Sequence, residues 1–438
     1  SGSSLVVFLC KAPAEAPAQA RAAMETLLAK HGKALVEKFI RGPELTLRLC
    51  NPALDGRVLM SQARFVADGQ GVIDLARQAP VSGSYEGVDA MGLFWSRTPV
   101  DGTAAADCGD LGQDPLVVTL QVLGEDGELL ASHAIKRTFT GPGVEVRDVR
   151  ERGLVGKMFE PAGAGPHQAV LVLGGSGGGM GWSHEMAALL ASHGFAALAL
   201  AYFAAEGLPS TLDRIPLEYF GTALAWLEAQ PCVAPGRIAV CGCSRGGELA
   251  LLLGATFPGI KAVVAYVPSG IAWPAYPASG RGAWTLKGEE IPHATTLTHE
   301  AWSEALANGT ATKDSFDWYL LPLRDPDYVA RTSIPVETIN GPVLMISGDA
   351  DGLWPSTALT EFAVRRFAQM GFPHRVEHLR YPDAGHGIAW PNGPTTTLKS
   401  RHPVSGEEMD MGGTPQGTAH ARQDSWPRVL AFLREAFE

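Results

Sequence analysis

Residues 238–257 read "IAVCGCSRGGELALLLGATF" and join an apolar run to a helix-forming run through a glycine-rich turn. The turn has the pattern Gly-x-Ser-x-Gly, with Gly242 and Gly246 on either side of Ser244. A serine between two glycines is typical of a nucleophile elbow, because the missing side chains let a strand and the following helix approach closely. The stretch therefore predicts a strand, a sharp turn and a helix, with Ser244 presented at the carboxyl end of the strand.

The sequence around this stretch alternates between strands and helices. Apolar runs that we expect to be strands with their following turns cover residues 168–175, 195–203, 237–243, 261–270, 341–351 and 375–387. Helix-forming runs cover residues 183–194, 216–230, 246–257 and 424–438. Buried strands separated by helices predict an α/β fold with a doubly wound, mostly parallel sheet. In such a sheet, functional residues gather beyond the carboxyl ends of the strands.

The first part of the chain has a different pattern. Short runs with alternating faces cover residues 44–50, 57–67, 92–98, 116–124 and 128–140. Such runs predict an immunoglobulin-like antiparallel β-sandwich. Residues 13–39, rich in Ala, Leu, Lys and Glu, predict an additional helix. We therefore expect two domains, residues 1–141 and residues 142–438, with insertions in the second at about 271–335 and 390–415.

The composition excludes several classes of function. The chain of 438 residues has 35 Lys and Arg against 46 Asp and Glu, a net charge of −11, which opposes binding to nucleic acid. No run reaches the roughly 18 apolar residues of a membrane span. The first residues lack the basic start of a secretory signal, and the last three are not a peroxisomal signal.

The cysteines indicate a reducing compartment, because they are scattered and lack the spacing of metal ligands. They are Cys10, Cys50, Cys108, Cys232, Cys241 and Cys243. With no export signal in the sequence, we expect a cytoplasmic protein.

A serine hydroxyl becomes a good nucleophile only when a histidine takes its proton and a carboxylate orients that histidine. In proteins with this elbow the chain order is serine, acid, histidine. His386, in "DAGHG", follows the last predicted strand in a glycine-bounded loop, and we expect it to be the base. The other candidates are His374 and His378, which we place beside or in the last strand, and His293, His299, His402 and His420, which we expect at the surface of irregular segments.

The acid is expected in "ISGDADGLWPS", residues 346–356, at the end of the preceding strand. Asp351, with a proline four residues later, has the usual spacing, and we favour it over Asp349. Asp349 would then cap the loop or bind its backbone. Asp383 is the weaker alternative, because it is too near His386 in sequence to reach the far nitrogen easily.

A tetrahedral intermediate needs two backbone N–H groups for its oxyanion. We expect one from Arg245, next to the serine, and one from Gly175 or Ser176 in the turn "GGSGGG" at 174–179. That turn lacks the Lys-Ser/Thr of a phosphate loop and has no acidic partner at the proper distance, so we expect no bound nucleotide. His-Glu-x-x-His is also absent. We expect neither a cofactor nor a metal ion.

These motifs belong to longer stretches that resemble the type I acyl-CoA thioesterases and the bile acid-CoA:amino acid N-acyltransferases. The matching stretches are "GGSGGG", "LALAYFAAEGLPSTLDRIPLEYFGTALAWL" (198–227), "GCSRGGELALLLG", "SGDADGLWPS", "YPDAGHG", "GGTPQGTAHARQDSWPRVLAFL" (412–433) and, in the first domain, "VSGSYEGVDAMGLFWSRTP" (81–99). The resemblance covers roughly residues 42–438. It implies an α/β-hydrolase domain preceded by a sandwich domain, and it places Ser244, Asp351 and His386 on the catalytic triad of the family.

The resemblance implies a small-molecule acyl thioester as substrate, carried on CoA or on a carrier protein. Hydrolysis through an acyl-enzyme is the favoured reaction. The family members that conjugate bile acids carry cysteine at the elbow, whereas this chain carries Ser244 there. Two alternatives use the same three residues: transfer of the acyl group to an amino acid, amine or hydroxyl acceptor, and hydrolysis of another acyl group by an esterase, lactonase or peptidase. A non-catalytic binding or scaffold protein is the last alternative. Residues 271–335 and 390–415 match the family least and are the expected walls of the acyl pocket.

Cys243 directly precedes the serine and carries the softer nucleophile. Because alternate side chains of a strand face opposite ways, we expect Cys243 to point away from the site and into packing. Cys241 should then share its face. We interpret "GCSRG" as a serine elbow with a structural cysteine beside it.

Overall fold

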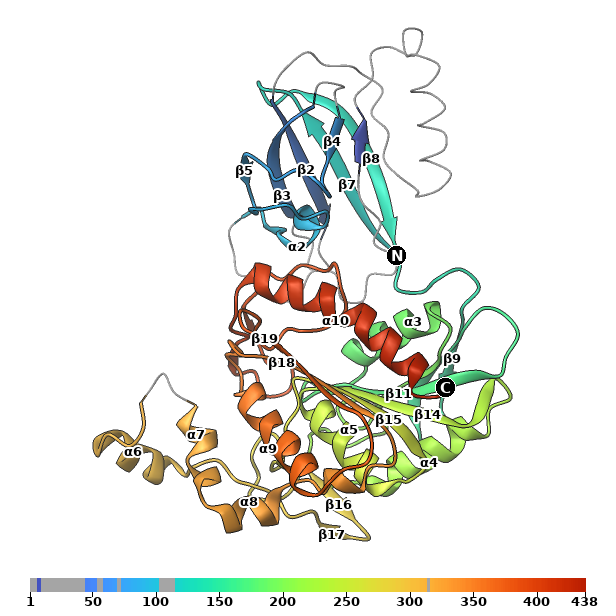
Figure 1. Ribbon diagram of the computed structural model, residues 1–438, viewed down its shortest axis with the longest axis vertical. Coiled ribbons are helices and arrows are strands. Elements are labelled where there is room, and N and C mark those ends of the chain that lie inside the picture. Colours follow the sequence, from blue (N-terminus) through green and yellow to red (C-terminus); the bar gives the residue numbers. More distant parts are fainter. Residues whose placement is uncertain (1–5, 9–43, 53–57, 69–71, 102–114, 313–315) are drawn as a thin grey trace. The chain divides into compact units, whose positions relative to one another are not determined.

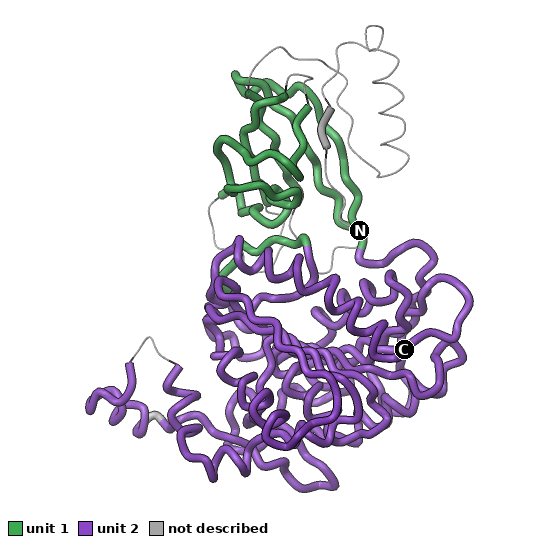
Figure 2. The backbone as a smooth tube through the Cα atoms, in the orientation of Figure 1, with its two compact units in different colours: residues 1–138, 392–400 green, residues 139–391, 401–438 purple. Residues whose placement is uncertain are grey.

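The computed structural model describes residues 6–8, 44–52, 58–68, 72–101, 115–312 and 316–438. The chain divides into two compact units (Figure 2). The N-terminal unit comprises residues 1–138 with 392–400, and the α/β unit comprises residues 139–391 with 401–438. The helix predicted over residues 13–39 lies outside the described residues.

The α/β unit is built on an eight-stranded sheet with the order β19-β18-β15-β14-β11-β12-β10-β9 (Figure 1). Its strands are β9 (Glu145–Val149), β10 (Val155–Glu160), β11 (His167–Leu173), β12 (Ala196–Ala201), β14 (Val233–Cys243), β15 (Ile260–Tyr266), β18 (Val343–Gly348) and β19 (Val376–Tyr381). From β12 to β19 all neighbours are parallel, whereas β10 pairs antiparallel with β9 and β12. The predicted mostly parallel sheet is confirmed, and the antiparallel β9–β10 edge is an addition that the sequence analysis missed.

Helices cover both faces of this sheet (Figure 1). One face is covered by α4 (Leu217–Glu228), α5 (Arg245–Thr256) and α9 (Ser356–Gln369), and the other by α3 (Gly181–Ser192) and α10 (Pro415–Glu435). Along β11, Leu171 and Leu173 face the first set of helices, while Val170 and Val172 face the second. Burial on both faces explains why this strand reads as a continuous apolar run.

A long excursion separates β15 from β18, as the sequence predicted. Its elements are β16 (Trp284–Leu286), β17 (Glu289–Glu290), α6 (His299–Ala307), α7 (Asp317–Leu320), η1 (Pro322–Arg324), α8 (Pro326–Thr332) and η2 (Val336–Thr338). β16 also pairs with β13 (Ile215–Pro216). Near the C-terminus, β20 (Lys399–Arg401) and β21 (Glu408–Asp410) form a separate two-stranded sheet.

For the N-terminal unit the sequence predicted an immunoglobulin-like antiparallel β-sandwich, and the described residues contain a six-stranded antiparallel sheet. Its order is β5-β3-β2-β7-β8, with β6 paired to β3. The strands are β2 (Glu44–Pro52), β3 (Val58–Val66), β5 (Ser82–Gly83), β6 (Thr98–Pro99), β7 (Leu116–Leu123) and β8 (Leu129–Arg137), and a separate pair is formed by β1 (Val6–Phe8) and β4 (Val72–Asp74). Alternate residues of β2, such as Leu45, Leu47 and Leu49, are buried, as a sheet with one covered face requires.

One predicted strand is a helix in the structure. The sequence predicted a strand over 92–98, but Gly92–Trp95 form the short helix α2. All four residues of α2 are buried, and a Cβ at Gly92 would collide with the Tyr85 ring. A short run of buried apolar residues does not show by periodicity whether it is strand or helix.

Two boundaries also differ from those predicted. Residues 392–400 cluster with the N-terminal unit, where Thr395 donates its amide hydrogen to the Trp95 carbonyl, although the sequence analysis placed them in an insertion of the second domain. Helix α10 starts at Pro415, before the predicted residue 424, because the Thr414 side chain accepts from the Gly417 amide and caps it.

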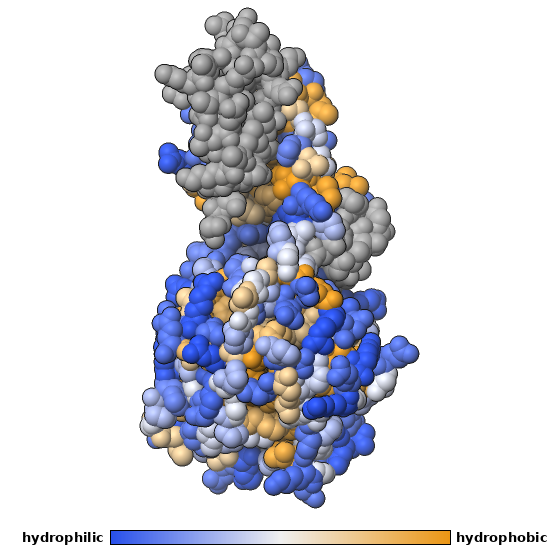
Figure 3. All heavy atoms as spheres, turned by 90° about the vertical axis from the view of Figure 1, so that its right-hand side faces the viewer, coloured by the Kyte–Doolittle hydropathy of each residue, from blue (hydrophilic) through white to orange (hydrophobic). Residues whose placement is uncertain are grey.

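The surface of the α/β unit in Figure 3 is mainly hydrophilic, with apolar atoms dispersed among polar ones. Large apolar side chains that are exposed occur mostly in the N-terminal unit, at Val58, Val66, Val81, Val88, Val100, Val117 and Leu129. Within the described ranges, no helix has the length and apolar character that crossing a membrane would require.

Candidate active site

Ser244 lies at the tight turn between β14 and α5, as predicted. Its backbone has φ 57° and ψ −122°, a conformation that a residue with a side chain rarely adopts. The amide of Ser244 donates to the Tyr266 carbonyl at 2.8 Å, which ties the turn to the end of β15. Ser244 therefore occupies a strained turn between β14 and α5, at the carboxyl edge of the sheet.

The two glycines of the motif make this turn possible. A Cβ at Gly242 would collide with the carbonyl of Gly246, and a Cβ at Gly246 would collide with the carbonyls of Leu173 and Gly174. A side chain at Gly242 would therefore push β14 away from α5, and one at Gly246 would push α5 away from the end of β11. This is the physical reason for the Gly-x-Ser-x-Gly pattern in this chain.

The structure brings the three predicted triad residues into one hydrogen-bonded chain. His386 Nε2 lies 3.0 Å from Ser244 Oγ, and His386 Nδ1 lies 2.8 Å from Asp351 Oδ2. All three are buried, with 8%, 7% and 3% of the surface of Ser244, His386 and Asp351 exposed. They follow β14, β19 and β18, so three separate strand ends supply one constellation.

Backbone bonds fix the acid and the base. The Asp351 carboxylate accepts hydrogen bonds from the amides of Leu353 and Trp354 at 3.0 and 3.2 Å, and the Trp354 ring packs edge-on against His386. The amide of His386 donates to the Met411 carbonyl at 2.7 Å. The next residue, Gly412, forms an isolated antiparallel β-bridge with Asp351. One stretch of chain therefore holds both the acid loop and the base loop.

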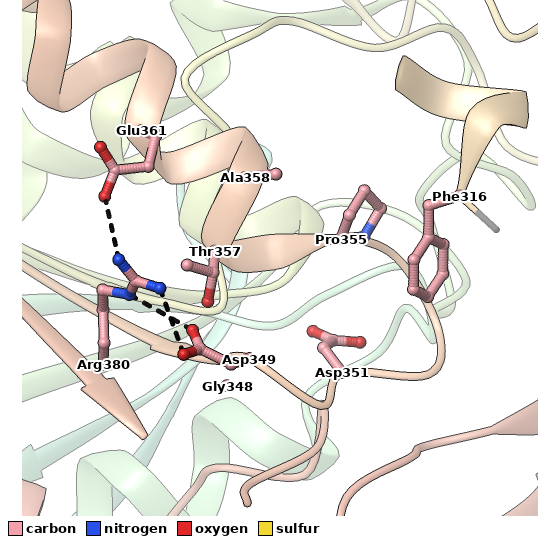
Figure 4. Close-up of a pocket in the computed structure, with 9 residues that line it drawn as sticks. All are labelled: Phe316, Gly348, Asp349, Asp351, Pro355, Thr357, Ala358, Glu361 and Arg380. Carbon is pink, nitrogen blue, oxygen red and sulfur yellow. Dashed lines mark hydrogen bonds and ion pairs between the residues drawn. The ribbon is translucent and has the colours of Figure 1, made fainter. Parts of the chain in front are cut away.

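The two alternative acids, Asp349 and Asp383, contact other residues. Asp349 was expected to cap its loop or bind the loop backbone. Its carboxylate makes an ion pair with Arg380, with an oxygen–nitrogen distance of 3.2 Å, and a hydrogen bond with the Thr357 side chain. Figure 4 shows Asp349 and Arg380 facing each other in a pocket of about 400 Å³ that Asp351 and Glu361 also line. The carbonyl of Asp383 accepts from the Thr414 amide at the start of α10.

Cys243 packs away from the site, as expected. It lies with Cys241 in the apolar cluster that β14 shares with α3 and α10. Burial, with a smaller contribution from the Asp351 charge, raises the pKa of the Cys243 thiol to about 12. At neutral pH the group is therefore a thiol and not the reactive thiolate.

Of the residues predicted to hold an oxyanion, Arg245 directly follows Ser244 and Gly175 lies beside it. A Cβ at Gly175 would stand 3.0 Å from Ser244 Cβ, so the 174–179 turn passes directly beside the serine. The amides of Gly175, Ser176 and Arg245 have no backbone acceptor among the residues that the structure describes. The oxyanion role of these amides stays a prediction, and the N-terminus of α5, which starts at Arg245, would add its dipole.

Sequence reasoning missed a buried ion pair beside the elbow. Arg245 Nε lies 2.8 Å from Glu248 Oε2, and both side chains are nearly inaccessible to solvent. Glu248 also accepts hydrogen bonds from the Trp284 indole at 2.7 Å and the Trp273 amide at 3.1 Å. Arg245 donates to the carbonyls of Trp273 and Pro274. The pair thus fastens the start of the 271–335 excursion to the helix that follows Ser244.

Two of the other candidate histidines, His378 and His402, form hydrogen bonds elsewhere. His378 lies in β19, as predicted, and bonds Ser347 at 2.7 Å. His402 was expected at the surface but is only 4% exposed, because it packs under the 174–179 turn. Its burial depends on contacts 226 residues away in sequence, so no local pattern could have revealed it. Across the described ranges, no group of three or more His, Cys, Asp or Glu residues is arranged to hold a metal ion.

Two family models together match most of the chain. The model described as "BAAT / Acyl-CoA thioester hydrolase C terminal" matches residues 215–438, and that described as "Acyl-CoA thioester hydrolase/BAAT N-terminal region" matches residues 33–151. Acyl-coenzyme A thioesterase 6 of Mus musculus and acyl-coenzyme A thioesterase 1 of Homo sapiens are each 32% identical over 395 residues, which covers 89% of this chain and 90% of theirs.

Among solved structures, the acylaminoacyl peptidase of Pyrococcus horikoshii matches with a TM-score of 0.43 and 13% identity, over 73% of this chain and 48% of that one. The family models and the two thioesterases agree with the resemblance read from the motifs. The chain therefore belongs to the acyl-CoA thioester hydrolase/BAAT family.

Proposed function

We propose that this protein hydrolyses a small-molecule acyl thioester of the acyl-CoA type, with the acyl group carried on Ser244. The observation that carries the proposal is the chain of hydrogen bonds from Ser244 through His386 to Asp351 at the carboxyl edge of the sheet. The relatives named as acyl-coenzyme A thioesterases support the substrate class.

In the first step, His386 Nε2 takes the proton of Ser244 while Ser244 Oγ attacks the thioester carbonyl. The carbonyl oxygen becomes an oxyanion, which the amide of Arg245 and that of Gly175 or Ser176 stabilise. Asp351 holds the proton on Nδ1 and stabilises the imidazolium. The carbon–sulfur bond then breaks, and His386 returns the proton to the thiolate, leaving an acyl ester on Ser244.

In the second step, water replaces the thiol. His386 takes a proton from the water as it attacks the ester, the same amides hold the second oxyanion, and the proton passes to Ser244 Oγ as the acid leaves. The reaction consumes one water and releases one thiol and one carboxylic acid. No cofactor or metal ion enters either step. The cytoplasmic location stays a prediction, in line with the free thiols of Cys50, Cys232, Cys241 and Cys243.

The test is incubation with a panel of acyl-CoAs of increasing chain length, with and without glycine or taurine. Thiol release is followed with a thiol reagent, and products are identified by mass. Wild-type protein is expected to release thiol and free acid, and Ser244→Ala is expected to release neither. Amide products in the presence of glycine or taurine would identify an acyltransferase instead. No thiol release at any chain length would overturn the proposal.

A further inference from the structure

His402 contacts the turn that borders Ser244. It follows β20 and, with 4% of its surface exposed, is one of the buried polar residues of the α/β unit. Its Nε2 is 3.0 Å from the hydroxyl of Ser176. This contact joins the segment between β20 and β21 to the turn from which the second oxyanion donor is expected.

The hydrogen bonds of the ring determine which nitrogen carries the proton. His402 Nδ1 lies 3.2 Å from the amides of both Val404 and Ser405 and can only accept from them. The ring proton is therefore on Nε2, and Nε2 donates to Ser176 Oγ. Burial lowers the pKa of His402, against a weaker opposite effect of Glu407, so the ring keeps this neutral form at neutral pH.

The neighbours of His402 hold the ring in place. The Tyr276 ring packs edge-on against it, with centroids 4.6 Å apart, and the Tyr276 hydroxyl is bonded to Ser405 at 2.7 Å and to Glu407 at 2.8 Å. The amide of His402 donates to the Glu407 carbonyl at 2.8 Å. These contacts hold the ring in one orientation, with Nε2 at hydrogen-bond distance from the Ser176 hydroxyl.

The supported turn is the one beside the nucleophile. At its start, the Tyr202 hydroxyl donates to the Gly174 carbonyl at 2.6 Å. Two residues later His402 holds Ser176, and a Cβ at Gly177 would stand 3.2 Å from the Pro403 ring. We propose that His402 is a positioning residue, whose hydrogen bond to the Ser176 hydroxyl keeps the amides of the 174–177 turn where the oxyanion forms.

This inference rests on the proposed function, because it assigns His402 a part in the same acyl transfer. The oxyanion exists only in the transition state and the intermediate, so a displaced turn weakens transition-state binding and leaves substrate binding nearly unchanged. A loss confined to kcat is therefore the expected signature. Misplaced reacting groups can lower rates by about 100-fold, and a change of about 10- to 100-fold is expected here.

Two amide substitutions separate the roles of the two ring nitrogens. His402→Asn keeps an acceptor near the Nδ1 position, so it preserves the bonds from Val404 and Ser405, but it is too short to reach Ser176. His402→Gln places an amide N–H near the Nε2 position and can restore the donor. His402→Asn is expected to lower kcat for an acyl-CoA about 10- to 100-fold at constant KM, and His402→Gln to recover most of it.

Ser176→Ala removes the same hydrogen bond by removing the hydroxyl that accepts it. It should lower kcat to a similar extent, and the His402→Asn/Ser176→Ala double variant should be no slower than either single variant, because both remove one interaction. His420→Asn, at an exposed histidine of α10, is the matched control and should behave as wild type. Thermal unfolding of every variant identifies those that fail to fold, and Ser176→Ala tests the inference even if His402→Asn fails.

The labelling rate of Ser244 by a fluorophosphonate gives a second readout, because the phosphonyl oxygen occupies the same donors without any thioester. Slower labelling of folded His402→Asn and Ser176→Ala supports the inference, even if wild type hydrolyses no acyl-CoA and the proposed function fails. Wild-type kcat and labelling rates in both variants would overturn the inference while leaving the proposed function intact. Strictly additive losses in the double variant, or a loss in KM alone, would overturn it as well.

Discussion

At Ser244 the backbone itself determines which of two adjacent nucleophiles is presented. The positive φ turns Ser244 toward His386, while Cys243 stays in the apolar cluster with a raised thiol pKa. Cys243→Ala is therefore expected to keep most of the thioesterase activity. Ser244→Ala should lower kcat by about 10⁴-fold or more, since in the proposed mechanism the nucleophile and its base act as a unit. Steady-state thiol release measures both, and the reverse order of activities would contradict the assignment.

The buried pair of Arg245 and Glu248 should matter for stability. Glu248→Gln leaves the Arg245 charge without a counter-ion in a site with almost no solvent, which is expected to lower the free energy of unfolding by about 3 kcal/mol or more. Urea unfolding measures this. Asp148→Asn, which breaks the solvent-exposed pair with Lys157, is the control and should leave stability nearly unchanged. Equal effects of the two substitutions would contradict the role given to burial.

Much of the candidate site could be predicted at the level of single residues. Ser244, Asp351 and His386 stand out because each follows a strand and chain order limits the choices. Two features could not be predicted, the pairing of Asp349 with Arg380 and the burial of His402. Both depend on which distant segments meet in the folded chain, which local spacing does not encode.

Among the structural elements, the segment after β21 holds the acid and base loops together. Gly412 has φ +65°, and a Cβ there would collide with the Ala350 carbonyl and the Gly352 amide. Gly412→Ala is therefore expected to shift the Asp351 loop and lower kcat at least about 10-fold. Gly371→Ala, at a similar φ of +64° with nothing within 4 Å, carries the same backbone strain without the collision. Comparable activities of the two purified variants would contradict this account.

The ion pair between η2 and α9 makes stability depend on pH. Hydrogen bonding to Arg366 lowers the pKa of Glu337 from its ordinary 4.5, so the pair stabilises the fold fully above pH 4.5, and this stabilisation is lost as pH falls through the lowered pKa. Glu337→Gln should cost about 1 kcal/mol or less at pH 7 and progressively less in acid. Urea unfolding of both proteins across this range measures the difference. A difference that grows toward low pH would contradict the sign.

The predicted elements of the α/β unit largely match the structure, because long apolar strands and amphipathic helices carry strong periodic signals. The β9–β10 edge was missed. In β9 four of its five residues are exposed, so this strand has no apolar run to reveal it. Helix α2 was mistaken for a strand because its apolar residues are buried on all sides.

For the whole molecule, the sequence predicted a mostly parallel sheet preceded by an immunoglobulin-like antiparallel β-sandwich, and the structure has a mostly parallel eight-stranded sheet and a six-stranded antiparallel sheet. What it could not predict is that residues 392–400 return to the N-terminal unit from a distant part of the chain. The return depends on backbone hydrogen bonds such as that from Thr395 to Trp95, for which side-chain patterns give no signal.

The central claim is that the acyl group of a thioester is carried on Ser244. It is tested most directly by acid-quenching the protein during turnover of an acyl-CoA and locating the acyl group by peptide mass spectrometry. The account predicts the acyl mass on Ser244 in wild type and Cys243→Ala, and no adduct or turnover in Ser244→Ala. An acyl group on Cys243, or turnover by Ser244→Ala at the wild-type rate, would contradict it.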